Sequence, residues 1–104
     1  MWNSEAIKKI VTDTRIVLFA KGTKEQPMCG FSHSAIQVMM HVGEDFEVIN
    51  IFDDPGIRPA LVEFSGWPTT PQLFIGGELI GGSDIVLEMY QNGELQTKLA
   101  ESAS

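Results

Sequence analysis

The sequence offers little that could cross-link the chain, because Cys29 is its only cysteine among 104 residues. A single cysteine cannot form a disulfide within the chain, and its isolation favours a reducing compartment. Basic residues are also few, since seven lysines and arginines stand against fourteen acidic residues and the formal net charge is −7. Nucleic acid and anionic membrane surfaces both need a basic patch, so we expect neither as a partner.

Long apolar segments are missing as well. No run approaches the roughly 20 apolar residues that are needed to cross a bilayer. The first residues, Met1–Glu5, lack the basic stretch and apolar core of a secretion signal. The expected compartment is therefore the cytoplasm, or an organelle if a leader peptide has been removed. The length suits one domain, residues 1–104, and the hydrophobic fraction of 43% is enough for a core.

Hydrophobic periodicity and turn residues predict an alternation of helices and strands. Ile16–Ala20 is apolar throughout, which fits a strand buried on both faces, and the pair Gly76-Gly77 predicts a hairpin. The predicted elements are a helix capped by Ser4, a strand at Ile16–Ala20, a helix from Cys29 to about Gly43, a strand at Phe46–Ile51, a helix at Ile57–Phe64, strands at Gln72–Ile75 and Glu78–Ile80, and a final helix that ends at Asn92-Gly93, before a last turn around Leu95 and Leu99. This order predicts an α/β fold with a mixed sheet between helices, but it leaves the strand order open.

Cys29 lies between a predicted strand and a predicted helix. The free N–H groups and the positive dipole end of a helix N-terminus favour a thiolate over a thiol. Ser32 occupies the position where a two-cysteine redox motif carries its second thiol, so the reaction of Cys29 must involve a second molecule. His33 could share a helix face with Cys29, but no further cysteine or histidine completes a zinc set, and a hydrolase would need more partners.

Three loops are expected to meet at one edge of the sheet, where ligands gather in α/β folds. The first is Lys21–Cys29, which delivers the thiol. The second is Trp67–Pro71, in which an X-Pro bond directly before a strand is a candidate cis peptide. The third is Gly81–Asp84, whose glycines permit close approach and whose helix N-terminus offers N–H groups to an anion.

With these loops the chain resembles the monothiol glutaredoxins, a family of the thioredoxin fold. The resemblance covers nearly the whole chain, and the motifs recur in the order and spacing of the family. They are Lys21-Gly22-Thr23, Pro27, Cys29-Gly30-Phe31-Ser32, Trp67-Pro68-Thr69, Pro71-Gln72, Gly81-Gly82 and Asp84-Ile85. The resemblance implies a thioredoxin-like three-layer sandwich, with a mixed four-stranded sheet flanked by helices.

The resemblance also implies a ligand site. Monothiol glutaredoxins bind glutathione beside the active cysteine, and the pair can ligate a 2Fe-2S cluster. By position, Lys21 and Arg58 would face the glycine carboxylate of glutathione, and the backbone of Thr70 would pair with its cysteine segment. Asp84 would take the ammonium of the γ-glutamyl end, and the adjoining helix N-terminus its carboxylate. The complete implied set is Lys21, Cys29, Arg58, Thr69, Thr70, Pro71, Gly82, Ser83 and Asp84, with Cys29 as the catalytic residue and metal ligand.

A 2Fe-2S cluster needs four thiolates, so one Cys29 and one glutathione from each of two chains would complete it. The resemblance therefore implies a homodimer bridged by the cluster, which acts as a scaffold or carrier in iron–sulfur cluster assembly and iron homeostasis. Iron–sulfur apo-proteins and BolA-like proteins are the implied partners. The alternative is a glutathione-dependent oxidoreductase that removes glutathione from mixed disulfides with one thiol. A third hypothesis is a regulatory module that senses iron through the cluster.

Several residues also have simpler interpretations. Cys29 could be a small buried hydrophobic residue, Arg58 a surface charge, and Asp84 the N-cap of the last helix. We interpret Trp67 as ordinary packing, and Phe31 as part of the rim around the thiol.

Three positions depart from the family pattern. Lys24 stands where proline is frequent, which predicts a looser loop. Thr70 replaces a larger apolar residue, and Ser83 stands where some relatives carry another cysteine, so no disulfide chemistry is possible there.

Overall fold

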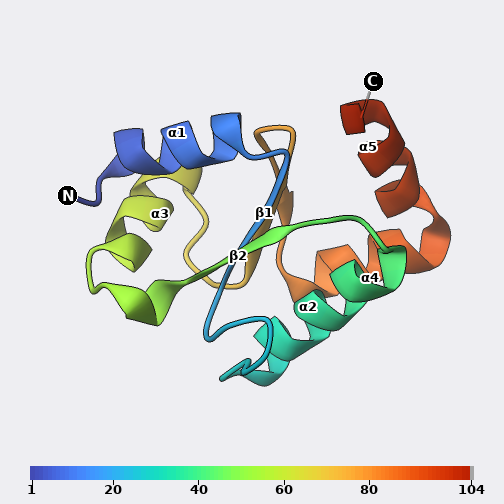
Figure 1. Ribbon diagram of the computed structural model, residues 1–104, viewed down its shortest axis with the longest axis horizontal. Coiled ribbons are helices and arrows are strands. Elements are labelled where there is room, and N and C mark those ends of the chain that lie inside the picture. The colour runs from blue at the N-terminus through green and yellow to red at the C-terminus, as the bar shows by residue number, and fades with distance from the viewer. Residues whose placement is uncertain (104) are drawn as a thin grey trace.

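The structure, a computed structural model, describes residues 1–103, and a mixed four-stranded sheet forms its centre (Figure 1). Its strands are β1 (Ile16–Ala20), β2 (Glu47–Asn50), β3 (Gln72–Ile75) and β4 (Glu78–Gly81), in the order β2-β1-β3-β4. β1 is parallel to β2 and antiparallel to β3, which in turn is antiparallel to β4. The predicted mixed sheet is confirmed, and the structure supplies the strand order.

Helices cover both faces of this sheet, so the fold has three layers (Figure 1). One layer contains α1 (Ser4–Asp13) and α3 (Ile57–Ser65), which pack against each other. The other contains α2 (Gly30–Val42) and α4 (Ser83–Asn92), and α5 (Glu94–Ala103) packs on α4. Within residues 1–103, no helix is both long enough and apolar enough to cross a membrane.

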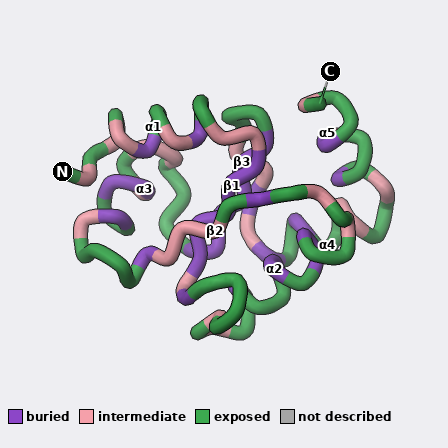
Figure 2. The backbone as a smooth tube through the Cα atoms, in the orientation of Figure 1, coloured by how far each residue is buried: buried purple, intermediate pink, exposed green. Residues whose placement is uncertain are grey.

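The central strand β1 supplies both hydrophobic cores, because neighbouring side chains of a strand point to opposite faces. Ile16, Leu18 and Ala20 belong to the core on the side of α2 and α4. Val17 and Phe19 belong to the core on the side of α1 and α3. All five residues of β1 are buried, as the continuous apolar run predicts, and Figure 2 shows this strand as the buried centre of the molecule.

Two predicted boundaries are wrong for local reasons. The N-cap of α1 is Asn3 rather than Ser4, because the Asn3 side chain accepts a hydrogen bond from the Ala6 N–H at 2.9 Å. The second strand ends at Asn50, since the Asn50 side chain accepts from the Phe52 N–H at 2.9 Å and starts a 3-10 turn, η1 (Ile51–Asp53).

The C-terminal segment forms a full helix where the sequence predicted only one turn. Gly93 adopts φ +87°, a left-handed conformation that ends α4 and redirects the chain. Leu95 and Leu99 then repeat at helical spacing and are both buried. The sequence analysis names both leucines, but it does not predict the separate helix that carries them.

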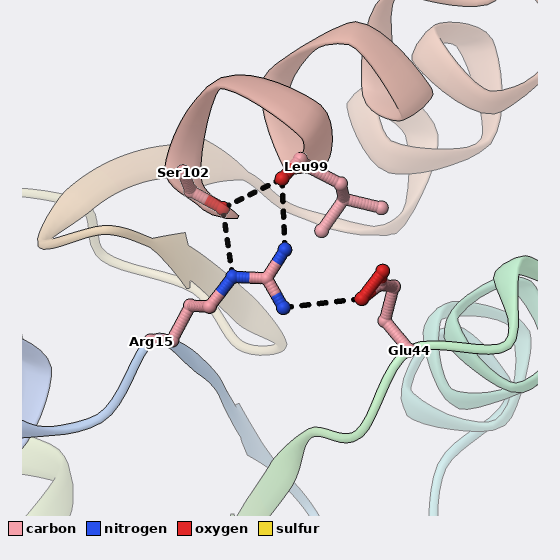
Figure 3. A network of polar contacts seen from close by, with 4 residues as sticks. All are labelled: Arg15, Glu44, Leu99 and Ser102. Carbon is pink, nitrogen blue, oxygen red and sulfur yellow. Dashed lines mark hydrogen bonds and ion pairs between the residues drawn. The ribbon is translucent and has the colours of Figure 1, made fainter. Parts of the chain in front are cut away.

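A partly buried arginine joins α5 to the rest of the fold (Figure 3). The Arg15 guanidinium donates to Ser102 Oγ at 3.1 Å, to the Leu99 carbonyl at 2.8 Å and to Glu44 Oε1 at 3.1 Å. The Arg15 carbonyl accepts from the Gly76 N–H at 2.7 Å, which ties in the β3–β4 hairpin. Arg15 precedes β1, so this network lies at the end of that strand opposite to the Cys29 loop.

Candidate functional site

The loop between β1 and α2 is closed on itself by short hydrogen bonds. The Lys21 carbonyl accepts from the Met28 N–H at 2.8 Å, and the Gln26 carbonyl accepts from the Thr23 N–H at 3.1 Å. Gly22 has φ +100°, and a Cβ there would lie 2.4 Å from the Gln26 carbonyl oxygen. Only glycine fits this position, because an added Cβ would collide with backbone. The loop therefore brings the start of α2 back beside the end of β1.

Lys24 does not leave this loop open. Its ammonium lies 4.2 Å from the centroid of the Phe46 ring, a cation–π contact across the surface. The loop keeps its backbone hydrogen bonds on either side of Lys24. A looser loop at this position stays a prediction, since these contacts do not measure mobility.

Asn50 connects the same loop to the next turn. Its Oδ1 accepts from the Gly22 N–H at 3.0 Å and from the Phe52 N–H at 2.9 Å. Its Nδ2 donates to Asp53 Oδ1 at 3.3 Å. Because these bonds join the loop after β1 to the turn before α3, the segment that carries Cys29 is fixed relative to the helix that carries Arg58.

Cys29 is the N-cap residue of α2 and is partly exposed. The nearby Ser32 backbone N–H is the main cause that lowers the pKa of Cys29 below its ordinary value. Partial desolvation opposes this change, while the Phe31 N–H, the Lys21 charge and the Ser32 hydroxyl lower the pKa further. The strand–loop–cysteine–helix prediction is confirmed, and the interpretation of Cys29 as a buried hydrophobic residue is wrong.

A pocket of about 440 Å³ lies where the three predicted loops meet. It takes a cation from each of two elements, Lys21 after β1 and Arg58 on α3, and a carboxylate from Asp84 on α4. Apart from Cys29 itself, every residue of the implied glutathione set lines it. The lining residues are Lys21, Phe31, Arg58, Trp67, Thr69, Thr70, Pro71, Gly82, Ser83, Asp84 and Ile85.

The N-terminus of α4 forms one wall of the pocket. Gly82 is the N-cap residue and has no side chain to satisfy the first N–H groups of the helix. Ser83 is buried, and Asp84 is an exposed residue of the first turn. The interpretation of Asp84 as the N-cap is therefore wrong, and its carboxylate is free of a capping role.

Three apolar side chains complete the pocket. Trp67 is 38% exposed and lines the pocket, so its interpretation as ordinary packing is wrong. Phe31, the predicted rim residue, is 64% exposed. Ile85, 37% exposed, belongs to the motif Asp84-Ile85, but the sequence analysis does not include it in the ligand site. The sequence signal that could have identified Ile85 is its place directly after Asp84, at the exposed start of the helix.

The Trp67–Pro71 loop has a cis peptide bond between Thr70 and Pro71, at the predicted position. Its carbonyls are held by side chains from β3 and α3. Gln72 Nε2 donates to the Trp67 and Thr69 carbonyls at 2.9 Å each, and Arg58 Nη2 donates to the Pro68 carbonyl at 3.4 Å. The loop thus forms a wall of the pocket, and side-chain hydrogen bonds hold its backbone in place.

Known proteins and solved structures that resemble this chain agree with this geometry. The glutaredoxin family model matches residues 16–80. A probable monothiol glutaredoxin 2 from Rickettsia typhi is 48% identical over 99 residues, which cover 95% of this chain and 89% of that protein. The solution structure of a monomeric truncated mutant of 1-C-Grx1 from Trypanosoma brucei superposes with a TM-score of 0.88 at 34% identity, over 99% of this chain and 94% of that one. A buckwheat glutaredoxin–glutathione complex gives a TM-score of 0.84 at 27% identity, over 96% and 89% of the two chains.

The sheet, the helix layers and the thiol at the N-terminus of α2 define a thioredoxin-fold protein with one active cysteine. The family match and the identity to its relatives are more specific. The chain belongs to the glutaredoxin family, and within it to the monothiol glutaredoxins.

Proposed function

We propose that this protein binds glutathione in the pocket beside Cys29 and uses the resulting pair of thiols to carry a 2Fe-2S cluster. The observation that carries the proposal is the composition of the pocket. Its walls bring two cations, one carboxylate and an uncapped helix N-terminus together beside a single activated thiol. Glutathione has two carboxylates and one ammonium, which are complementary to these groups. The glutathione complex of the buckwheat relative supports the same ligand.

Each wall has a distinct task in this proposal. Lys21 and Arg58 attract the glycine carboxylate, and the N–H groups at the start of α4 hold the γ-glutamyl carboxylate. Asp84 pairs with the ammonium of the ligand. Thr70 presents its backbone to the cysteine segment, between Thr69 and Pro71. The ligand thiol then lies beside the Cys29 sulfur.

The metal-ligating residues of this chain fit a cluster that two chains share, rather than a metal site within one chain. Among the described residues, no group of three or more metal-ligating side chains is present, and the sequence has one cysteine. Because a 2Fe-2S cluster needs four thiolates, Cys29 and one glutathione supply half of the set and a second copy supplies the rest. Few protein contacts are then required, which suits a cargo that must be passed on.

The proposal includes the partners and the place of action. A second copy of this chain would share the cluster, and a BolA-like protein or an iron–sulfur apo-protein would replace it when the cluster is delivered or sensed. A cytoplasmic location follows from the reducing conditions that a single free thiolate requires, and an organelle such as that of the chloroplastic relative is the alternative.

A second function is favoured by the lowered pKa of Cys29. In this reaction the Cys29 thiolate attacks the glutathione sulfur of a protein–glutathione disulfide. A new disulfide forms between Cys29 and glutathione, and the protein thiolate leaves. The thiolate of a second glutathione then attacks the bound glutathione sulfur, so that glutathione disulfide leaves and the Cys29 thiolate is restored.

Anaerobic reconstitution tests the proposal directly. Wild-type protein with iron, sulfide and glutathione should gain the visible absorption of a 2Fe-2S cluster and elute as a dimer with one cluster and two glutathiones. It should return to the monomer when the cluster is lost. Omission of glutathione, or the change Cys29→Ser, should abolish the cluster. If no cluster forms and the wild type reduces mixed disulfides as fast as a two-cysteine glutaredoxin, the oxidoreductase function replaces the carrier function.

A further inference from the structure

One buried side chain holds the Trp67–Pro71 loop from the side of the sheet. Gln72, the first residue of β3, is 0% exposed and lies outside the pocket lining. Its two amide protons are directed to the Trp67 and Thr69 carbonyls, each at 2.9 Å. Its Oε1 is buried and has no hydrogen-bond partner among the described residues. An unpaired buried carbonyl is unfavourable, so the two donated bonds are the favourable contribution of this side chain.

The bond to the Thr69 carbonyl determines where the next N–H points. Among the described residues, the only cis peptide bond is the one between Thr70 and Pro71, so the peptide between Thr69 and Thr70 is trans. In a planar trans peptide the carbonyl and the following N–H point in opposite directions. Because the Thr69 carbonyl is directed at Gln72, the Thr70 N–H is directed away from it. Thr70 lines the pocket, so its backbone lies where a ligand can reach it.

The bond to the Trp67 carbonyl fixes the other end of the loop. The Pro68 carbonyl between these two accepts from Arg58 Nη2 at 3.4 Å. Three successive carbonyls thus have side-chain donors, two of them from Gln72. This arrangement determines the position of the Trp67 indole in the pocket wall. It also determines the position of the Pro68 carbonyl, which is the hydrogen-bond partner of Arg58.

We propose that Gln72 is a positioning residue for ligand binding: by holding the Trp67 and Thr69 carbonyls it aims the Thr70 N–H at the peptide backbone of the bound ligand. This inference rests on the proposed function, since the ligand is glutathione. Gln72 lies outside the pocket lining, so it acts through the loop rather than by contact with the ligand. The preorganised loop lowers the cost of ordering the wall when the ligand binds.

The test is the change Gln72→Met, which keeps the length of the side chain and removes both donors. Calorimetric titration with reduced glutathione should show binding about tenfold weaker than in the wild type, as expected for a misplaced recognition group. The pKa of Cys29, from the pH dependence of alkylation, should stay unchanged, because Ser32, Phe31 and Lys21 set it. Gln96→Met, the same replacement on exposed α5, is the matched control and should bind like the wild type.

Amide hydrogen exchange in the ligand-free protein provides a second readout. In Gln72→Met the Trp67, Thr69 and Thr70 amides should exchange faster, while amides of α2 keep their wild-type rates. If Gln72→Met does not fold, Gln72→Leu, a smaller apolar side chain that also removes both donors, takes its place in both measurements.

The outcomes distinguish a failure of the positioning role of Gln72 from a failure of the proposed function. Wild-type glutathione affinity in the Gln72 variant, or a loss of affinity accompanied by a shifted Cys29 pKa, overturns the positioning role and leaves the proposed function standing. If the wild type itself does not bind glutathione, the proposed function fails, and the exchange rates decide the positioning role. Unchanged rates in the variant would then overturn it, and faster loop exchange would support it.

Discussion

The Lys21 backbone N–H donates a hydrogen bond of 3.0 Å to the hydroxyl of Ser32, which is completely buried. This bond joins the end of β1 to the first turn of α2, on either side of the loop that delivers Cys29. The same serine lowers the pKa of Cys29 through its backbone N–H and its hydroxyl. The position that lacks a second thiol is therefore a structural connection, and its serine has its own role in the site.

Replacing Ser32 with alanine should affect both roles. The Lys21 N–H would lose its acceptor, at a cost of about 1–3 kcal/mol in the free energy of unfolding. The pKa of Cys29 should rise toward its ordinary value, since the hydroxyl contribution is lost. Urea unfolding and the pH dependence of alkylation measure the two effects. Ser34→Ala, on the exposed side of α2, is the control and should change neither. Wild-type stability in Ser32→Ala would contradict this account.

The reactivity of Cys29 should depend on pH with a midpoint below the ordinary thiol value of about 8.5. The lowered pKa increases the thiolate fraction at neutral pH, so the iodoacetamide rate should rise through the lowered pKa and level off above it. The same shift stabilises the fold above the unfolded-state pKa, and this contribution disappears as the pH falls through the folded-state pKa. Protein unfolded in urea is the reference. Equal midpoints in the folded and unfolded states would refute an activated thiolate.

Gly22→Ala should disrupt the loop before Cys29. Its φ of +100° disfavours any side chain, and a Cβ would lie 2.4 Å from the Gln26 carbonyl and 2.6 Å from the Met28 nitrogen. Strain of this kind costs about 1–3 kcal/mol, and the backbone contacts add to it. Gly30→Ala is the matched control, since a Cβ there meets nothing within 4 Å and the residue is helical. Chemical unfolding should show a loss for Gly22→Ala and none for Gly30→Ala. A similar stability for both variants would count against the closed loop.

Arg15→Met should destabilise the fold without changing the site. The guanidinium makes three hydrogen bonds to Ser102, Leu99 and Glu44, with 35% of its side chain exposed. We expect a loss of about 1–3 kcal/mol in urea unfolding, since bonds to a charged donor are strong but solvent weakens them here. Lys9→Met is the control, because Lys9 forms an exposed pair with Asp13 and should cost well under about 1 kcal/mol. Equal losses would show that the network adds nothing.

How far the sequence predicts this protein depends on how local each signal is. The strand Ile16–Ala20, the hairpin at Gly76-Gly77 and the placement of Cys29 at a helix start follow from neighbouring residues, and the structure confirms them. The strand order does not, because it depends on pairing between distant segments. The sequence does not predict α5 as a separate helix, because Gly93 marks a helix end and α5 begins at the very next residue, with no turn segment between them.

Prediction of the site residues from sequence is limited in the same way. The resemblance to the monothiol glutaredoxins predicts the eight residues beside Cys29 that line the pocket, but the role of each remains a prediction. Trp67 and Ile85 belong to the resemblance motifs but have no place in the predicted ligand set, because an apolar residue carries no sequence mark of exposure. The hydrogen bonds of Gln72 were missed since a polar residue at a strand start gives no sign of burial.

Asp84→Asn tests the ligand assignment at the α4 wall. The change keeps the shape of the side chain and removes the charge that would pair with the ammonium of glutathione. Glutathione binding should weaken by about 1–3 kcal/mol, as expected for a charged hydrogen bond, and cluster assembly should fall with it. The fold should be largely unaffected, because Gly82 rather than Asp84 occupies the N-cap position of the helix. Glu88→Gln, an exposed carboxylate one turn further along α4, removes an equal charge away from the pocket lining and should bind normally.

Titration calorimetry at two salt concentrations distinguishes the direct pair from a general charge effect. If both variants weaken binding equally, and salt removes the difference from the wild type, Asp84 acts only through net charge and the proposed contact with the ammonium is wrong.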